Sequence, residues 1–310
     1  MVPFDLDAQS SPSFAAGTAP RLRVAVVTMV YNEPVFPPIW LRHYAGLVGV
    51  ENCLVVDHGS DDGSTRDLRG AGTIRLPRTA LREQERCAFI SDLCRGLLRY
   101  HDAVIYTDVD ELLVVDPARH GSLDALLRQE QAPVIRAIGF NVRQLTGIEG
   151  PLDLARPVSR QRRMVQLVTC MFKPLVVREA VRWAPGFHDC DLPTAFAPLF
   201  LFHLRLADRD IALGRLAKTR AQDWSCPLDA AAAKHQLIPD AEMIAGLDRA
   251  VALPRQHGMD FDITEPPLRD LLAMIIAEEA QGLRDDIYRI GINRAAAELW
   301  ALPRRLVGTF

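Results

Sequence analysis

Short apolar runs that alternate with amphipathic segments constrain the fold of this chain more than any other feature. The run RVAVVTMV (23–30) is rich in β-branched residues and is typical of a strand buried on both faces. Apolar residues then recur at helical spacing in 37–50, a second short strand precedes the turn in 52–65, and 81–100 has one apolar helical face. This last segment leads into the apolar run AVIYTDVDELLVVDP (103–117). Strands that alternate with helices in this way predict a parallel sheet with helices on both faces.

The alternation stops after a short predicted helix at 122–130. Three strand-like segments separated by polar loops follow, at 133–142, 163–172 and 174–189, and they indicate a mixed or antiparallel second half. Beyond residue 240 the apolar spacing is helical again, with Thr264 as the expected cap of the last helix.

These patterns predict a division into three parts. The Ser-, Pro-, Ala- and Gly-rich residues 1–20 are expected to form a flexible arm, because such a composition buries too little apolar surface to offset its ordering entropy. Residues 21–235 are expected to form the main α/β domain, and 236–310 a helical appendage.

Composition narrows the classes of partner and the location. The chain has 310 residues, of which 49% are hydrophobic, and a net charge of −3, so no global field favours nucleic acid or an anionic membrane as the main partner. Its six cysteines include no C-x-x-C pair and are expected to be reduced thiols in a cytoplasmic protein. A signal peptide would require basic residues near its start, but no Lys or Arg precedes Arg21. No apolar run reaches the roughly 20 residues of a membrane span. The basic tail LPRRLVGTF (302–310) suits either packing onto the domain or peripheral contact with a membrane or a partner.

The run AVIYTDVDELLVVDP also carries four carboxylates. Since residues two apart on an extended strand point the same way, Asp108 and Asp110 are expected to project together, while Glu111 points to the other side and Asp116 ends the strand. Two adjacent carboxylates repel unless a cation, a shared proton or water lies between them. Carboxylate oxygens suit Mg²⁺ or Mn²⁺, so the pair predicts a divalent metal site, with a solvated acidic turn or a helix cap as the alternative.

A second polar turn lies at the end of the second predicted strand. In VVDHGSDDGST (55–65), Asp57 ends the strand and Gly59 and Gly63 permit tight turns. A carboxylate at this place can accept hydrogen bonds from a nucleobase or ribose. The alternative is an ordinary Asp/Gly-rich turn.

These motifs occur in a characteristic order. The blocks are VVTMVYNE (26–33), LVVDHGSDDGST (54–65), LREQERCAFISDLC (81–94) and VIYTDVDELLV (104–114), followed by GFHDCDLP (186–193) and LFHLRLAD (201–208). Across residues 22–220 the sequence resembles the family-2-like glycosyltransferases of the GT-A fold, in particular the branch with a D-x-D-E strand end. The resemblance implies a Rossmann-like mixed sheet flanked by helices, here with a helical C-terminal appendage.

The resemblance further implies a nucleotide-diphosphate sugar bound across the carboxyl edge of the sheet. It places donor contacts at Thr28, Tyr31, Asn32, Glu33, Asp57, Arg82, Arg86, Asp108 and Arg205. It places Mn²⁺ or Mg²⁺ on Asp108, Asp110 and His203. Three alternatives stay open: Arg82 or Arg86 as an exposed helix arginine, His203 as a hydrogen-bonded core residue, and a lost base contact, because His58 stands where many relatives have a second acid.

The implied chemistry assigns further roles. A divalent ion would act as a Lewis acid on the departing nucleoside diphosphate, and an acceptor hydroxyl would need a general base. The candidates for that base, or for acceptor binding, are Asp191, Asp189 and His188, whose alternative role is to stabilise a turn. The arginines of SRQRRM are expected either to bind a phosphorylated acceptor or to form a solvated face; they are Arg160, Arg162 and Arg163.

The sequence therefore predicts a cytoplasmic, metal-dependent glycosyltransferase. Its partners would be a nucleotide sugar and a glycan or lipid-linked acceptor, and by family analogy it would contribute to a bacterial-type surface polysaccharide. A nucleotide-sugar-binding module without turnover is an alternative from another class. A haloacid-dehalogenase-like phosphatase also uses D-x-D, but it needs the motif on the first strand with Thr or Val after the second Asp, and Glu111 stands there. A sugar nucleotidylyltransferase needs an arginine-bearing Gly-rich loop where this chain has MVYNEP.

Overall fold

The computed structural model describes residues 20–222, 237–280 and 285–310. The predicted arm lies outside the described residues except for its last residue, as do Cys226 and the predicted boundary after residue 235. None of the described helices is long and apolar enough to cross a membrane.

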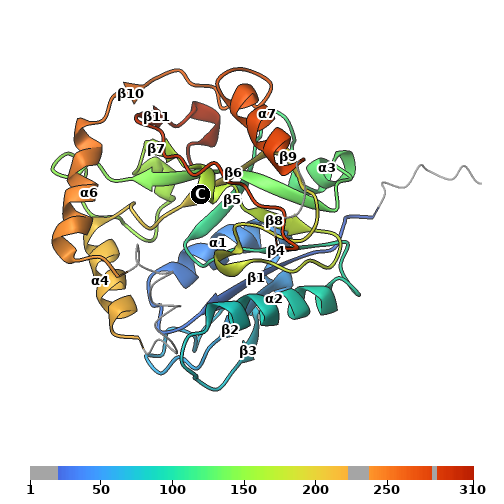
Figure 1. The fold of residues 1–310 in the computed structure, drawn as a ribbon. Helices are drawn as coiled ribbons and strands as arrows, with labels where there is room; N and C mark the ends of the chain where they lie inside the picture. Colours follow the sequence, from blue (N-terminus) through green and yellow to red (C-terminus); the bar gives the residue numbers. More distant parts are fainter. Residues whose placement is uncertain (1–19, 223–236, 281–284) are drawn as a thin grey trace, which may run out of the picture.

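The first half of the chain forms the predicted parallel sheet. Strand β1 (Val24–Val30) pairs in parallel with β2 (Cys53–Asp57) on one side and with β4 (Ala103–Tyr106) on the other. A further parallel strand, β3 (Gly72–Arg75), extends the sheet beyond β2 and was not predicted. The order β3-β2-β1-β4 brings the carboxyl ends of these strands to one edge (Figure 1).

Two helices cover opposite faces of this parallel sheet, as the strand and helix alternation predicts. Alternate residues of β1 point to opposite sides: Val26 lies in one apolar cluster with Trp40 of α1 (Phe36–Val48), and Val27 lies in another with Ile90 of α2 (Glu83–Leu97). Figure 1 shows the two helices on either side of β1. The sheet is therefore buried on both faces at its centre.

The second half extends the same sheet with antiparallel and parallel pairs. Strand β8 (Pro174–Val177) is antiparallel to β4, β6 (Val134–Arg143) is antiparallel to β8, and β7 (Met164–Leu167) is antiparallel to β6. Strand β9 (Ala195–His203) is parallel to β6 and antiparallel to β5 (Glu111–Val115). The mixed α/β architecture expected from the sequence is confirmed.

The acidic run is not one strand, contrary to the sequence-based expectation. Strand β4 ends at Tyr106, β5 begins at Glu111, and the two strands pair with different partners. Asp108 and Asp110 lie in the connection between them, where the amide of Glu111 donates to the carbonyl of Asp108 at 3.0 Å. The two aspartates are therefore placed by a turn and not by strand alternation.

The C-terminal segment contains two helices and also joins the sheet. It contains α6 (Asp240–Ala252) and α7 (Leu268–Glu279), and α7 begins after Pro267 rather than after the expected cap Thr264. Strand β11 (Leu299–Ala301) is antiparallel to β7 and pairs with the two-residue strand β10 (Arg255–Gln256). The remaining described helices are α3 (Leu123–Gln129), α4 (Arg209–Arg220) and the 3₁₀ turns Val50–Asn52, Val158–Arg160, Thr169–Met171, Pro185–Phe187 and Arg304–Leu306.

Candidate functional site

Charged side chains from several elements meet at the carboxyl edge of the parallel strands. Because β1 and β4 run in parallel, the residues that follow them come together there, which is where ligands bind in open α/β sheets. Helix α4 contributes two cations to the same group, and the segments before β8 and within α2 contribute one each. We call this group the edge cluster; its carboxylates are Glu33, Asp108, Asp110 and Glu111, and its cations are Arg86, Lys173, Arg215 and Lys218.

Lys173 joins two of these carboxylates. Its ammonium group donates to Asp108 Oδ2 at 3.0 Å and to Glu111 Oε1 at 2.5 Å, and only 3% of the lysine side chain is exposed. Burial alone would lower the pKa of Lys173, but the charges of Asp108 and Glu111 raise it above its usual value. Burial likewise favours the neutral form of Asp108, yet Lys173 and Arg86 hold its pKa well below the usual range. The expectation that Glu111 points away from Asp108 is wrong, because both bind the same ammonium group.

Asp110 is paired with a cation from α4. Its Oδ2 accepts from Arg215 Nη1 and lies 3.2 Å from His203 Nε2. The other ring nitrogen of His203 lies 2.9 Å from Asn141 Oδ1 on β6. Burial opposes ionisation of Asp110, but Arg215 and His203 lower its pKa well below the ordinary value. The predicted proximity of Asp110 and His203 is therefore present, and Arg215 is an additional member that the sequence motifs did not indicate.

Glu33 connects β1 to α4. Its Oε2 lies 3.0 Å from both Arg215 Nε and Lys218 Nζ, and only 4% of its side chain is exposed. Lys218 also donates to the carbonyl of Asn32 at 2.9 Å. Burial would lower the pKa of Arg215, but Asp110 and Glu33 raise it. Arg215 therefore bridges carboxylates that follow two neighbouring strands.

The structure separates the two candidate arginines at the start of α2. Arg86 donates to Asp108 Oδ1 at 3.1 Å and also binds Glu83, so it belongs to the edge cluster. Arg82 has 64% of its side chain exposed and lies 3.8 Å from Glu85. The alternative of an exposed helix arginine thus describes Arg82 and not Arg86.

Asp57 ends β2 as predicted, but its carboxylate already has protein partners. Oδ1 accepts from the amide of Ser60 at 2.7 Å, and Oδ2 accepts from Thr65 at 3.0 Å and from Arg75. Burial would raise the pKa of Asp57, but these hydrogen bonds, led by that from the Ser60 amide, and the charge of Arg75 lower it. The carboxylate stabilises the turn after β2, and a contact with a base or ribose stays a prediction.

The other residues predicted to lie near the nucleotide differ in their burial and contacts. Tyr31 lies under the guanidinium of Arg78 at 3.6 Å, and Asn32 binds the loop after β2 through Asp61. Thr28 is fully buried inside β1, so a nucleotide on the surface of this edge does not reach it. The ring of His58 lies 3.0 Å from both Arg78 and Thr79, and burial followed by the charge of Arg78 lowers the pKa of His58.

The side chains do not fit a resident divalent ion in this arrangement. Such an ion needs several ligands that converge on one point. Within residues 20–222, 237–280 and 285–310, no group of three His, Cys, Asp or Glu side chains is arranged to hold a metal ion. The expected ligands Asp108 and Asp110 instead accept from Lys173, Arg86 and Arg215.

The candidates for a general base lie on the loop around the 3₁₀ turn Pro185–Phe187, where the Gly186 amide donates to Glu83. Asp189 is largely buried against Arg136, and Asp191 accepts from the amide and Nε of Arg182. His188 Nδ1 lies 2.6 Å from the carbonyl of Cys170. These contacts show that both carboxylates already bind arginines. They do not test whether one of the three residues acts as a general base, so that role stays a prediction.

The structure places the remaining predicted arginines in different surroundings. Arg205 follows the end of β9 at His203, close enough to the edge cluster for the charges of Asp110 and Arg215 to act on it, and its contact with a donor stays a prediction. Arg162 does not belong to a solvated face with the exposed Arg160 and Arg163, because only 2% of its side chain is exposed and it donates to the carbonyls of Ala207 and Gly150. A joint acceptor site on these arginines is therefore not formed.

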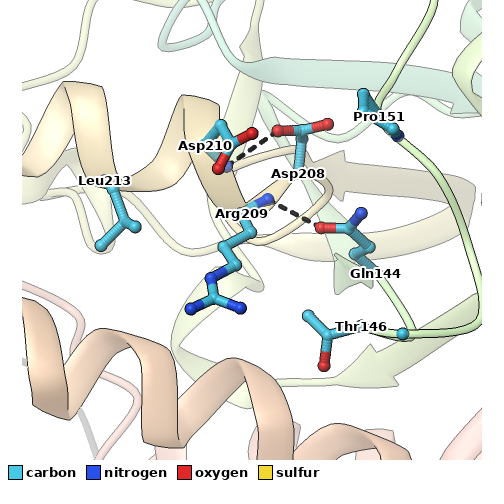
Figure 2. Close-up of a pocket in the computed structure, with 8 residues that line it drawn as sticks. Gln144, Thr146, Pro151, Asp208, Arg209, Asp210 and Leu213 are labelled. Atoms are coloured by element: carbon cyan, nitrogen blue, oxygen red, sulfur yellow. Dashed lines mark hydrogen bonds between the residues drawn. The ribbon is translucent and has the colours of Figure 1, made fainter.

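A surface cavity of about 400 Å³ lies at the first turn of α4. Figure 2 shows its polar lining, in which Gln144 accepts from the amide of Arg209 and Asp208 caps the helix. None of the sequence-predicted site residues lines it. It borders the opposite end of α4 from Lys218.

Motif spacing missed Lys173, Arg215 and Lys218, because each lies far along the chain from the carboxylate that it binds. One compositional signal could have found the lysines. The chain has 36 Lys and Arg residues, but lysine stands only at Lys173, Lys218 and Lys234. Both lysines within the described residues belong to the edge cluster.

No protein-family model matches this chain, and neither does any curated protein. Among solved structures, S. aureus TarS 1–349 has a TM-score of 0.37 and 11% identity, with 74% of this chain and 73% of that chain covered. Mannosyltransferase PcManGT from Pyrobaculum calidifontis, in complex with GDP-Man and Mn²⁺, has a TM-score of 0.34 and 16% identity, with 88% and 83% covered. Mannose-1-phosphate geranyltransferase from Thermus thermophilus has a TM-score of 0.29 and 12% identity, with 73% and 68% covered. TM-scores this low carry no conclusion about the activity of this chain.

Proposed function

We propose that this chain transfers a glycosyl group from a nucleotide-diphosphate sugar to a hydroxyl group of a glycan or lipid-linked acceptor. The observation that supports it is the edge cluster, in which cations from three separate segments converge on the D-x-D-E carboxylates at the carboxyl edge of the parallel sheet. An anionic diphosphate is the type of ligand that such a concentration of donors recognises.

The reaction would proceed at the anomeric carbon of the donor. The bond from that carbon to the phosphate oxygen breaks, its electron pair stays on the nucleoside diphosphate, and the acceptor oxygen forms the new bond. Positive groups near the diphosphate stabilise the charge that develops on it. No step is assigned to a divalent ion, because the side chains as arranged do not fit one.

The acceptor proton must pass to a base within hydrogen-bond reach. Of the sequence-predicted candidates we keep Asp191, because it remains partly exposed whereas Asp189 is enclosed with Arg136 and Glu279. The donor's nucleotide would lie toward Tyr31 and the loop after β2, which adjoin the edge cluster through Asn32 and Glu33.

The test is to incubate the full chain with UDP-, GDP-, ADP- and dTDP-sugars and to measure release of the nucleoside diphosphate, with Mn²⁺, with Mg²⁺ and with EDTA. We expect one donor to be hydrolysed slowly in the absence of an acceptor, and Asp110→Asn to reduce the rate by at least about tenfold, because it releases Arg215 from its fixed position. Arg220→Gln is the matched control, because Arg220 binds Asp240 outside the edge cluster. Binding of a donor without release would indicate the nucleotide-sugar-binding module, and no binding of any donor would refute the proposal.

A further inference from the structure

We propose that Arg215 and Lys218 of α4 bind the donor diphosphate directly, while Lys173 compensates the D-x-D-E carboxylates on which the sequence motif predicts a divalent ion. This inference rests on the proposed function and concerns the same site. It reverses the metal dependence that the D-x-D-E sequence motif predicts.

The first step is that the edge cluster already neutralises its carboxylates. Asp108 and Glu111 share Lys173, at 3.0 and 2.5 Å, and Asp110 binds Arg215. Glu33 lies 3.0 Å from Lys218. A divalent ion gains most from carboxylates whose charge is not compensated, and here each carboxylate has a cation from the chain.

The second step is the position of the two cations on α4. Arg215 and Lys218 are three residues apart, so they lie on one side of the helix. The exposed fractions of their side chains are 28% and 27%, whereas that of Lys173 is 3%. A ligand that approaches the edge therefore meets Arg215 and Lys218, while Lys173 offsets Asp108 and the buried Glu111.

The third step is the donor capacity of these groups. A guanidinium has five N–H donors and an ammonium has three. Arg215 directs Nε to Glu33 and Nη1 to Asp110, which fixes its plane at the point between β1 and β4. The three donors of Lys218 face Glu33 Oε2 at 3.0 Å and the carbonyls of Asn32 and Tyr31 at 2.9 and 3.4 Å, so Lys218 would meet a phosphate oxygen by exchanging its long contact with Tyr31. Arginine fits pairs of phosphate oxygens, and lysine binds phosphate as a point charge, so the pair suits a diphosphate.

The fourth step is the use of lysine. This chain uses arginine almost everywhere for a cation, yet both of its described lysines lie in the edge cluster. An ammonium group is compact and can sit between two carboxylates or approach one phosphate oxygen without the planar fork of arginine. Lysine at these positions is what a small cation site inside the cluster requires.

The experiment measures binding of UDP, GDP, ADP and dTDP to the full chain by calorimetry, in EDTA and in Mn²⁺. For the nucleotide that binds, we expect dissociation constants in the two buffers to agree within about threefold. In EDTA, Arg215→Gln should weaken binding by about tenfold to a hundredfold, the range for loss of a hydrogen bond to a charged group. Arg220→Gln on the same helix is the control and should change it by less than about twofold.

One further readout separates this role from a structural one. Arg215→Gln leaves Glu33 and Asp110 without the guanidinium that they share, so Mn²⁺ should restore most of the lost affinity in this variant while leaving wild type unchanged. Lys218→Met is measured in parallel in case Arg215→Gln does not fold, because the Lys218 side chain is partly exposed. We expect Lys218→Met to weaken nucleotide binding in EDTA by at least about fivefold.

The outcomes distinguish the two proposals. If wild type binds a nucleotide only in Mn²⁺, the inference is overturned while the proposed function stands. If neither variant weakens binding more than the Arg220→Gln control, the inference is overturned as well. If no nucleotide in the panel binds in either buffer, the proposed function fails and the inference fails with it.

Discussion

Replacement of Lys173 by Met removes a charge that the buried Glu111 and the partly exposed Asp108 share. The lysine side chain is 3% exposed and that of Glu111 is 2% exposed, and the two groups lie 2.5 Å apart. Removal of one partner from a buried ion pair costs about 3–5 kcal/mol, because the remaining charge is left without compensation. Asp108 keeps Arg86 at 3.1 Å, so we expect a loss near the lower end, about 3 kcal/mol. Methionine retains much of the apolar volume of lysine, so the cavity contributes little.

The same substitution should make stability depend on pH in a specific direction. Burial already raises the pKa of Glu111 above its ordinary 4.5, and Lys173 opposes that rise. Without the lysine, the folded-state pKa rises further above the unfolded value. A carboxyl group with a raised folded pKa costs least below the unfolded pKa, and its cost grows as the pH rises through the folded pKa. The destabilisation caused by Lys173→Met should therefore be larger at about pH 8 than at about pH 5.

The assay is urea unfolding followed by circular dichroism at these two pH values. Wild type, Lys173→Met and Lys173→Met/Glu111→Gln are compared, and the double variant should recover about 1–2 kcal/mol because the unpaired charge is gone. Arg220→Gln, which breaks a partly exposed pair with Asp240, should stay within about 1 kcal/mol of wild type. A loss smaller than about 1 kcal/mol for Lys173→Met at pH 8, or an equal loss at both pH values, would refute the reasoning.

Three other substitutions test the packing and charge of the fold. Burial lowers the pKa of His43 to about 4, so wild type should lose about 2–3 kcal/mol of unfolding free energy as the pH falls from 6.5 to 4, and His43→Gln should lose less in the same titration. In Gly139→Ala the new Cβ would lie 2.3 Å from backbone atoms of Met171, so thermal melting should show a loss of at least about 2 kcal/mol; an unchanged melting temperature would contradict this. Arg136→Met leaves Glu279 buried without a cation and should cost about 3 kcal/mol in urea unfolding, and strictly additive effects of Arg136→Met and Glu279→Gln would contradict their coupling.

Local periodicity was sufficient for the elements whose burial pattern is regular. The apolar stripe of 81–100 predicted α2, and the β-branched run 23–30 predicted β1. Strand β3 was missed because Gly72–Arg75 is mostly exposed and shows no apolar alternation. The run 103–117 was read as one strand because its apolar residues are nearly continuous, although β5 (Glu111–Val115) pairs with β9 and not beside β4.

In the candidate site, too, features set by neighbouring residues were predictable, whereas features set by residues far apart in the sequence were not. Asp108, Asp110 and Glu111 lie within four residues, so their motif was visible, but the direction of Glu111 depended on a turn that strand alternation does not describe. His203 reaches Asp110 because β9 lies beside β5, with His203 opposite Glu111 in the register. Only the family resemblance, and no pattern within the chain, connected His203 with the aspartates.

The counterions of the edge cluster could not be deduced from motif spacing, because the carboxylates lie close together in the sequence and their cations do not. The D-x-D-E carboxylates are contiguous, whereas their cations come from α2, from the segment before β8 and from α4. Lysine and arginine replace each other readily on a solvated surface, so the choice between them carries information only where geometry restricts it. Lysine is rare in this chain, so Lys173 and Lys218 indicate restricted cation positions even before any distance between side chains is known. Composition, which says nothing about the order of strands, thus indicates two of the three cations that motif spacing misses, whereas Arg215 is one of many arginines and has no such signal.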